Sequence, residues 1–154
     1  MLIMSKSKPY DLHDRLGYKL ALVARINDQF MDAGLAEIGL TRQMWCVLVA
    51  VGEQKICQPS EIASYIGINR SAVSRTLRDM DSKGMLERHC GSGDGRSTLV
   101  SLTDEGCRLL TASLPISYQS QVRMAESLSS REQAQLARLL DKFLSVPHGV
   151  PSHI

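Results

Sequence analysis

The sequence predicts a mainly α-helical, single-domain fold with one small β-hairpin, which places it in the α+β class. Apolar residues recur every three or four positions over most of the chain, as they do along one face of a helix. This period is lost only between Met85 and Leu102, where two short runs flank the glycine-rich segment GSGDGRS, a hairpin pattern. A chain of 154 residues is long enough for one core, and its surface can also be buried against a partner.

The first helix is predicted from Asp11 to about Gly34. Its stripe contains Leu12, Leu16, Leu20, Val23, Ile26 and Phe30. Leu22 beside Val23 widens this stripe beyond what one neighbouring helix covers. We therefore expect the helix to serve a subunit interface.

A short helix and a connection are predicted next. Thr41 is of the residue type that caps a helix N-terminus, and the apolar run after it predicts a short buried helix that ends near Gly52. Residues 54–58 form a connection with room for a brief strand.

The segment 59–80 predicts a helix-turn-helix. Pro59 opens one helix, and the next begins after Asn69, an N-cap residue type, and ends near Lys83. Gly67 suits the turn between them because glycine tolerates the backbone conformation that ends a helix. Ordinary helical hairpins share this pattern, but a hairpin over residues 85–102 directly afterwards is the layout of a winged helix-turn-helix.

Two more helices follow the hairpin. Thr103 and the acidic residues after it predict a helix N-terminus, and Pro115 predicts a kink in that helix, with a break as the alternative. The sequence SSRE at 129–132 has capping-box spacing and predicts the start of a last helix. On that helix the residues predicted to face inward are Leu136, Leu139, Leu140, Phe143 and Leu144.

The helix that begins after Asn69 carries the strongest functional pattern. Val73, Leu77 and Met80 define its buried face by their spacing. The exposed side is then formed by Arg70, Ser71, Ser74, Arg75 and Arg78. One helix fits the DNA major groove, where arginine can bond guanine and serine or asparagine can bond bases or phosphates. The alternative is a solvated face whose arginines pair with Glu61, Asp79 or Asp81.

The overall charge of the chain gives no evidence for nucleic-acid binding, so the prediction depends on where the charges lie. The net charge is +2, and residues 58–108 hold seven basic and seven acidic residues. No set of residues with catalytic, metal-binding or cofactor-binding spacing is present, so an enzyme is not predicted. The opening segment is shorter than a signal peptide and no apolar run reaches the length of a membrane span, so we expect a cytoplasmic protein without a membrane partner.

The sequence resembles the MarR family of bacterial transcriptional regulators over residues 11–145. The most specific match is the wing signature D-x-R followed by five residues and L-T-x-x-G, formed here by Asp94, Arg96, Leu102, Thr103 and Gly106. The segment PSEIASYIGINRSAVSRTLRDMDSKGML and the later LSSRE support it. The terminal residues 1–9 and 146–154, the latter with two prolines and a glycine, are predicted to be disordered or flexible tails. The resemblance implies one domain at 10–145, with dimerisation helices at 10–36 and 104–145 and a winged DNA-binding part at 41–102.

The resemblance also implies a function. It implies a homodimer that binds a pseudo-palindromic operator in double-stranded DNA, acts as a repressor and is released by a small aromatic or amphipathic effector. Asn69 would cap the recognition helix, and Arg96, held by Asp94, would contact the minor groove. Candidates for an effector pocket are Phe30, Met44 and Trp45, for which core packing is the alternative. Cys57 and Cys90 are candidates for thiol-based redox sensing, and a winged protein-interaction module is the alternative from another class.

Overall fold

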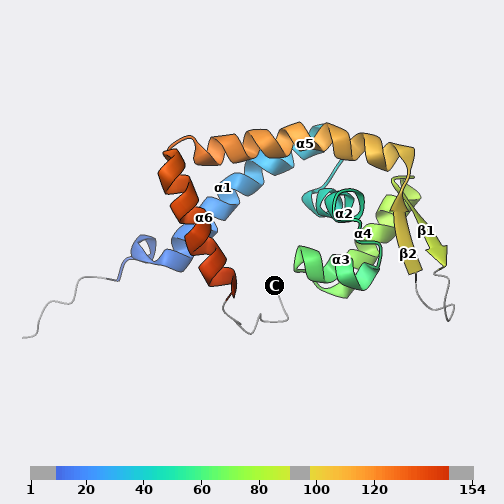
Figure 1. Ribbon diagram of the computed structural model, residues 1–154, viewed down its shortest axis with the longest axis horizontal. Helices are drawn as coiled ribbons and strands as arrows, with labels where there is room; N and C mark the ends of the chain where they lie inside the picture. The colour runs from blue at the N-terminus through green and yellow to red at the C-terminus, as the bar shows by residue number, and fades with distance from the viewer. Residues whose placement is uncertain (1–9, 91–97, 146–154) are drawn as a thin grey trace, which may run out of the picture.

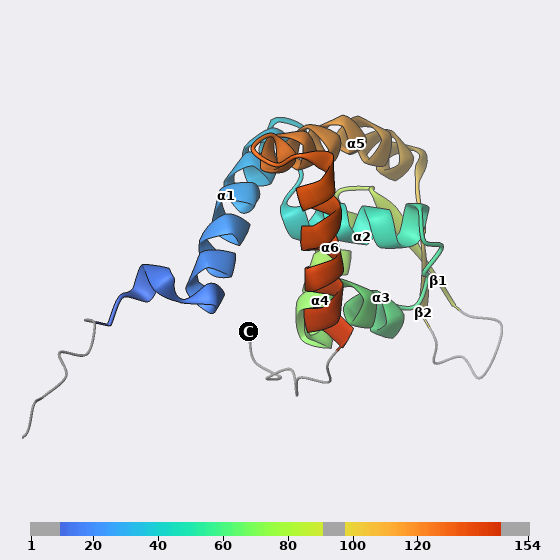
Figure 2. The ribbon, with the colours of Figure 1, turned by 60° about the vertical axis from the view of Figure 1, so that its left-hand side comes forward.

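The computed structural model describes residues 10–90 and 98–145 of the chain. Its elements in chain order are the 3-10 helix η1 (Leu12–Asp14), α1 (Leu16–Glu37), α2 (Arg42–Gly52), α3 (Pro59–Ile66), α4 (Arg70–Ser82), β1 (Leu86–Cys90), β2 (Thr98–Leu102), α5 (Asp104–Ala125) and α6 (Ser130–Ser145). Figure 1 shows α2, α3, α4 and the hairpin beneath the N-terminal end of α5, with α6 turned down from its other end. We call the elements from α2 to β2 the winged part. In both views α1 crosses beneath α5 and leads away from it (Figures 1 and 2).

Local capping rules correctly predict where most helices begin and end. The side chains of Thr41, Asn69 and Thr103 each accept a hydrogen bond from a backbone N–H three residues later. Gly67 ends α3 in the left-handed conformation, with a φ of 77° that glycine adopts without strain. The capping box before α6 is also present, because Glu132 accepts hydrogen bonds from the backbone N–H and the hydroxyl of Ser129.

The prediction for the first helix was wrong at both ends. Asp11 caps the separate short helix η1 by accepting a hydrogen bond from the backbone N–H of His13. Arg15 then adopts an extended conformation, so α1 begins only at Leu16. At the other end α1 continues past Gly34 to Glu37, because at Gly34 the helix packs closely against Ile116 of α5.

Two further expectations concern irregular positions. The helix α5 runs through Pro115 without a break, so the alternative of a broken helix was wrong. No strand forms at 54–58, although the Cys57 carbonyl accepts a hydrogen bond of 2.9 Å from the backbone N–H of Val100 in β2. The connection is therefore attached to the hairpin by a single hydrogen bond.

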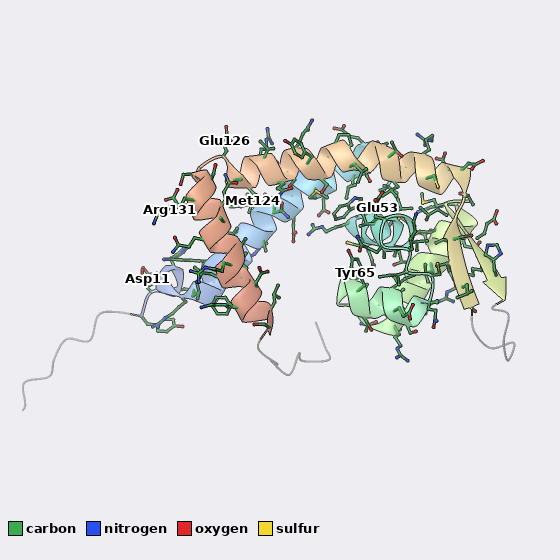
Figure 3. All side chains as sticks on the ribbon, viewed as in Figure 1. Asp11, Glu53, Tyr65, Met124, Glu126 and Arg131 are labelled. Atoms are coloured by element: carbon green, nitrogen blue, oxygen red, sulfur yellow. The ribbon has the colours of Figure 1, made fainter. Side chains whose placement is uncertain are left out.

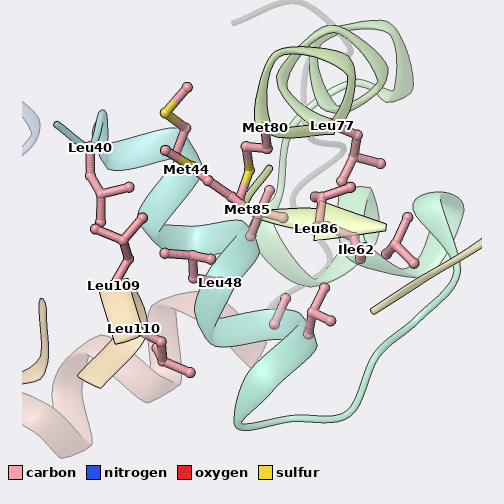
Figure 4. Packing of buried hydrophobic residues seen from close by; sticks show 14 of the residues in the cluster. Leu40, Met44, Leu48, Ile62, Leu77, Met80, Met85, Leu86, Leu109 and Leu110 are labelled. Atoms are coloured by element: carbon pink, nitrogen blue, oxygen red, sulfur yellow. The ribbon is translucent and has the colours of Figure 1, made fainter. Parts of the chain in front are cut away.

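The hydrophobic core lies within the winged part and continues onto the N-terminal half of α5. Figure 4 shows Met44 and Leu48 of α2 packed with Ile62, Leu77 and Leu86. Helix α1 contributes only Met31 and Leu35 from its C-terminal end. The core thus fixes the position of α4 relative to the hairpin and α5.

The apolar side chains of α6 do not enter this core, so the prediction that they face inward was wrong. The exposed large apolar residues of α1, α5 and α6 include Leu16, Leu20, Val23, Ile26, Phe30, Leu114, Tyr118, Val122, Leu136, Leu139, Leu140, Phe143 and Leu144. The exposed fraction of Leu144 reaches 83%. The periodicity correctly identified one apolar face of α6, but no element among residues 10–90 and 98–145 covers it. We call these residues the uncovered apolar face.

The hairpin joins α5 at a close contact. The two strands pair antiparallel from Leu86 with Leu102 to Cys90 with Thr98. The hydroxyl of Thr103 donates a 2.6 Å hydrogen bond to the Gly84 carbonyl, and the Thr103 N–H donates one of 3.3 Å to the Met85 carbonyl. A Cβ at Gly106 would lie only 2.0 Å from the Met85 carbonyl oxygen. Glycine at this position is required by the contact between α5 and the backbone that follows α4.

The joint between α1 and α2 is a sharp bend. The two helix axes meet at 80°, Gly39 in the link has a φ of 74°, and Leu40 anchors the link in the core. Among the described residues no single helix is long and apolar enough to cross a membrane, and α1 and α2 reach that length and hydropathy only together, across this bend.

Candidate nucleic-acid interface

Helix α4 has one buried face and one polar face, as its sequence predicts. Val73, Leu77 and Met80 are at most 1% exposed and pack into the core of the winged part. Sequence reasoning missed Thr76, which is also buried on this face. Its hydroxyl tolerates burial because it donates a hydrogen bond to the Ala72 carbonyl of the preceding turn. The opposite side consists of the exposed residues Arg70, Ser71, Ser74, Arg75 and Arg78. We call these five residues the cationic face of α4.

The acidic residues near this face are engaged elsewhere. Asp79 pairs with Lys83 at 2.9 Å, and Asp81 lies 3.4 Å from the guanidinium of Arg88 on β1. Within the described part of the chain, none of the three arginines of the cationic face forms an ion pair. The side-chain contact recorded for Arg78 is a 3.3 Å hydrogen bond from its Nε to the Ser74 carbonyl. Three positive charges are therefore available to an external anion.

The N-terminus of α4 is held by Asn69. Its Oδ1 accepts a 2.8 Å hydrogen bond from the Ala72 N–H and a 2.7 Å hydrogen bond from the Ser71 hydroxyl. A helix N-terminus carries a partial positive charge that favours phosphate, and this charge adds to that of Arg70 beside it. The arrangement can bind a phosphate backbone and present side chains to base edges in the major groove.

The predicted wing contact lies outside the described residues. Asp94 and Arg96 both belong to the segment between β1 and β2, so their assignment stays a prediction. The last described pair of the hairpin is Cys90 with Thr98.

The structure does not bring the three effector candidates together. Met44 is 2% exposed and belongs to the core, as the alternative interpretation expected. Trp45 lines a cavity of about 370 Å³ between α2 and α3, together with Val49, Tyr65 and Ile66. Phe30 lines a separate cavity of about 510 Å³ between α1 and α5.

The two cavities differ in chemistry. The indole Nε1–H of Trp45 is buried and has no hydrogen-bond partner among the described atoms, a costly arrangement unless something accepts from it. Tyr65, which Figure 3 labels on α3, lines the same cavity. In the other cavity the Arg123 guanidinium stacks 4.5 Å from the centre of the Phe30 ring. Sequence reasoning missed both Tyr65 and Arg123. Tyr65 is 20 residues from Trp45 in sequence and Arg123 is 93 residues from Phe30, so only the fold brings each pair together.

The cysteines occupy different environments. Cys57 is half-buried, and its Sγ lies 3.5 Å from the Lys55 carbonyl. Burial raises the pKa of the Cys46 thiol, although the positive charge of Arg42 acts in the opposite direction. Cys90 ends β1 in the hairpin, and Cys107 is exposed near the start of α5. Within residues 10–90 and 98–145 no cluster of His, Cys, Asp and Glu could hold a metal ion.

Comparison with known proteins identifies this arrangement. A sequence model of the MarR family matches residues 38–97. The chain is similar to a cysteine-to-serine mutant of MarR from E. coli in complex with operator DNA, at 26% identity and a TM-score of 0.80 over 88% of this chain and 99% of that one. A probable transcriptional regulator from Pseudomonas aeruginosa is 26% identical, with a TM-score of 0.77 over 86% of this chain and 99% of that one.

A third solved structure shares the fold. BpsR from Bordetella bronchiseptica, whose DNA binding is regulated by 6-hydroxynicotinic acid, is 21% identical, with a TM-score of 0.82 over 90% of this chain and 99% of that one. The sequence match covers the helix-turn-helix and β1, and the structural matches extend the likeness to the long helices on either side. The segment 38–97 thus matches the MarR family, and the chain shares its fold with MarR from E. coli and the Pseudomonas regulator over most of its length.

Proposed function

We propose that this protein is a sequence-specific DNA-binding repressor that acts as a homodimer on a pseudo-palindromic operator. The observation that carries the proposal is the cationic face of α4, whose three arginines form no ion pair with any described residue. A helix docked in the major groove places such side chains against guanine edges and phosphates. The similar MarR mutant from E. coli, which was solved with operator DNA, supports this use of the fold.

The uncovered apolar face supports the proposed homodimer. It spans α1, the C-terminal half of α5 and α6, all on the side of the molecule away from the hairpin (Figure 1). Many large apolar side chains exposed on neighbouring helices are costly in water and indicate an interaction site. A second copy of the chain offers the same face, so a two-fold axis through it covers both. The two recognition helices would then meet half-sites about 34 Å apart on one side of the duplex.

A gel-shift titration tests the DNA-binding assignment. The duplex is first selected from a random pool with the wild-type protein, and affinity is then measured for the double variant Arg75→Ala with Arg96→Ala. We expect binding to be abolished while the dimer stays intact. Arg108→Ala is the matched control, because it removes a positive charge that is paired with Glu105 at 2.6 Å within α5. Unchanged affinity in the double variant would refute the site assignment.

Salt dependence separates DNA binding from the alternative, a winged module that binds another protein. If the dimer neutralises about six phosphates, affinity should fall on the order of a thousandfold over a few-fold rise in salt, because bound counterions are released. A protein-interaction module has no such affinity for a selected duplex.

We further propose that a small aromatic acid or amide binds beside Trp45 and releases the DNA. The supporting feature is the cavity of about 370 Å³ beside Trp45, whose largely apolar lining also includes Tyr65 and suits a small aromatic ring. Trp45 is the only tryptophan in the chain, so its fluorescence reports the site directly. Titration with 6-hydroxynicotinate and benzoate should change its emission and weaken binding to the selected duplex. Weakened DNA binding with constant emission would place the effector elsewhere, with the cavity beside Phe30 as the next candidate.

A further inference from the structure

A charged cluster bridges the bend between α1 and α2. The Arg42 guanidinium, at the first residue of α2, donates hydrogen bonds of 3.2 and 2.8 Å to the two carboxylate oxygens of Asp32. It also forms an ion pair with Asp28, which lies one helical turn before Asp32 on α1. Two acidic side chains on one face of α1 are thus joined to the first turn of the winged part.

The cluster extends a short hydrophobic joint. The buried residues that α1 contributes are Met31 and Leu35, both in its C-terminal half. Asp28 lies almost one turn before Met31, so the Arg42 cluster extends the attachment of α1 by almost one turn beyond the buried residues. Arginine suits this role because its planar guanidinium presents donors in a fixed fork, whereas lysine offers a single point charge.

The angle at this joint has a large effect on geometry because α1 is long. A helix of 22 residues is about 33 Å long, so a rotation of about 6° at one end moves the other by about 3.4 Å, the rise of one base pair. The far part of α1 carries much of the uncovered apolar face, and the winged part carries the cationic face of α4. When the far part of α1 is held in the dimer, a change in the bend rotates the winged part about it, so the two recognition helices move relative to each other.

We propose that Arg42, held by Asp28 and Asp32, is a positioning residue that sets the spacing between half-sites accepted by the dimer. This inference rests on the proposed DNA-binding function and adds to it the determinant of operator spacing. The ion pairs of Arg42 are partly exposed to solvent, so their contribution to folding stability should be modest. The expected consequence of removing the cluster is a loss of discrimination between spacings, and not loss of the fold or of the dimer.

A series of duplexes tests this directly. The operator selected with the wild-type protein is lengthened and shortened at its centre by one and two base pairs, and Kd is measured by fluorescence anisotropy at one salt concentration. The proteins compared are the wild type, Arg42→Ala, Arg42→Lys and the double variant Asp28→Asn with Asp32→Asn. Arg108→Ala, which breaks an ion pair within one helix, is the matched control. Dimer mass and thermal unfolding are measured for each protein.

We expect the wild type to prefer its own spacing over a one-base-pair change by about tenfold or more, as specific contacts are lost together at one half-site. Arg42→Ala and the double aspartate variant should reduce this preference to about threefold or less, and Arg42→Lys should fall between them because it keeps the charge without the fork. Arg108→Ala should match the wild type.

Three results would overturn the inference. First, Arg42→Ala and the double aspartate variant could show the same dependence of Kd on spacing as the wild type. That result would refute the positioning role of Arg42 but not the proposed DNA binding. Second, Arg108→Ala could lose the preference for one spacing as fully as Arg42→Ala does. The loss would then result from removing a positive charge and not from the position of Arg42. Failure of the wild type to bind any duplex refutes the proposed function and this inference with it.

Discussion

Replacing Gly106 with alanine introduces a methyl group into the contact between α5 and the backbone that follows α4. The new Cβ would lie 2.0 Å from the Met85 carbonyl oxygen, whereas real contacts of this kind essentially never fall below 3.0 Å. The two groups must therefore separate by about 1 Å, and the 3.3 Å hydrogen bond from the Thr103 N–H to the same oxygen is lost. Overpacking costs about 1–3 kcal/mol and a lost hydrogen bond about 1 kcal/mol, so the free energy of unfolding should fall by about 2–4 kcal/mol.

Two other glycines provide graded controls. At Gly17, in the first turn of α1, a Cβ would meet nothing within 4 Å, and alanine should be neutral or stabilise by up to about 1 kcal/mol. At Gly34 a Cβ would lie 2.6 Å from the Cγ2 atom of Ile116, which can rotate away, so the effect should be intermediate. Thermal unfolding at one fixed protein concentration measures all three, and Gly106→Ala should lower Tm by about 6–12 °C.

The order of the three variants is the critical result. If Gly106→Ala lowers Tm no more than Gly34→Ala, the close contact at Met85 does not constrain the fold and the reasoning is refuted. Binding to the selected duplex provides a second measurement, because displacement of the Met85 backbone shifts the turn that ends α4. Gly17→Ala should leave that affinity unchanged.

Three further predictions concern caps and a thiol. Asn69→Ala removes the acceptor for the Ala72 N–H and should lower the free energy of unfolding by about 1 kcal/mol, measured by urea denaturation, whereas Asn69→Ser should retain most of it. Hydrogen bonds from Ser129 hold the pKa of Glu132 below its ordinary value, so the stability they add is present at neutral pH and lost as pH falls through that lowered pKa. Glu132→Gln keeps an acceptor that does not titrate, so its free energy of unfolding should fall less than that of the wild type as the pH is lowered. An equal fall in the two proteins would contradict the assignment. Because burial raises the pKa of the Cys46 thiol, iodoacetamide should modify Cys46 more slowly than exposed Cys107 at pH 8, as peptide mass spectrometry can show.

Features set by neighbours in sequence were predictable, and features set by distant contacts were not. Thr41, Gly67, Asn69 and Thr103 act through backbone groups within four residues, so their residue types identified the helix ends correctly. The period of α6 correctly predicted one apolar face, but a period cannot tell whether the same chain or another covers it. The prediction that Leu136 and the other apolar residues of α6 face inward was therefore wrong.

The candidate sites follow the same division. The buried face of α4 follows from the spacing of Val73, Leu77 and Met80, and so does the exposure of its arginines. The separation of Phe30 from Trp45, and the contact of Arg42 with Asp28 and Asp32, depend on the 80° bend between α1 and α2. Nothing in the local pattern around Gly39 specifies that angle, because it results from the packing of Leu40 and the long helices.

The hydrogen bond between Ser71 and Asn69 determines what Ser71 can offer to a base. A serine hydroxyl has one proton, and here that proton is donated to Asn69 Oδ1 over 2.7 Å. The Ser71 oxygen is left with lone pairs alone, so toward the major groove it can accept from the amino group of adenine or cytosine but cannot donate to guanine O6 or to a phosphate. The arginines of α4 have the opposite polarity, as they only donate. The N-terminal turn of the helix thus combines arginine donors for guanine with one serine acceptor that disfavours it.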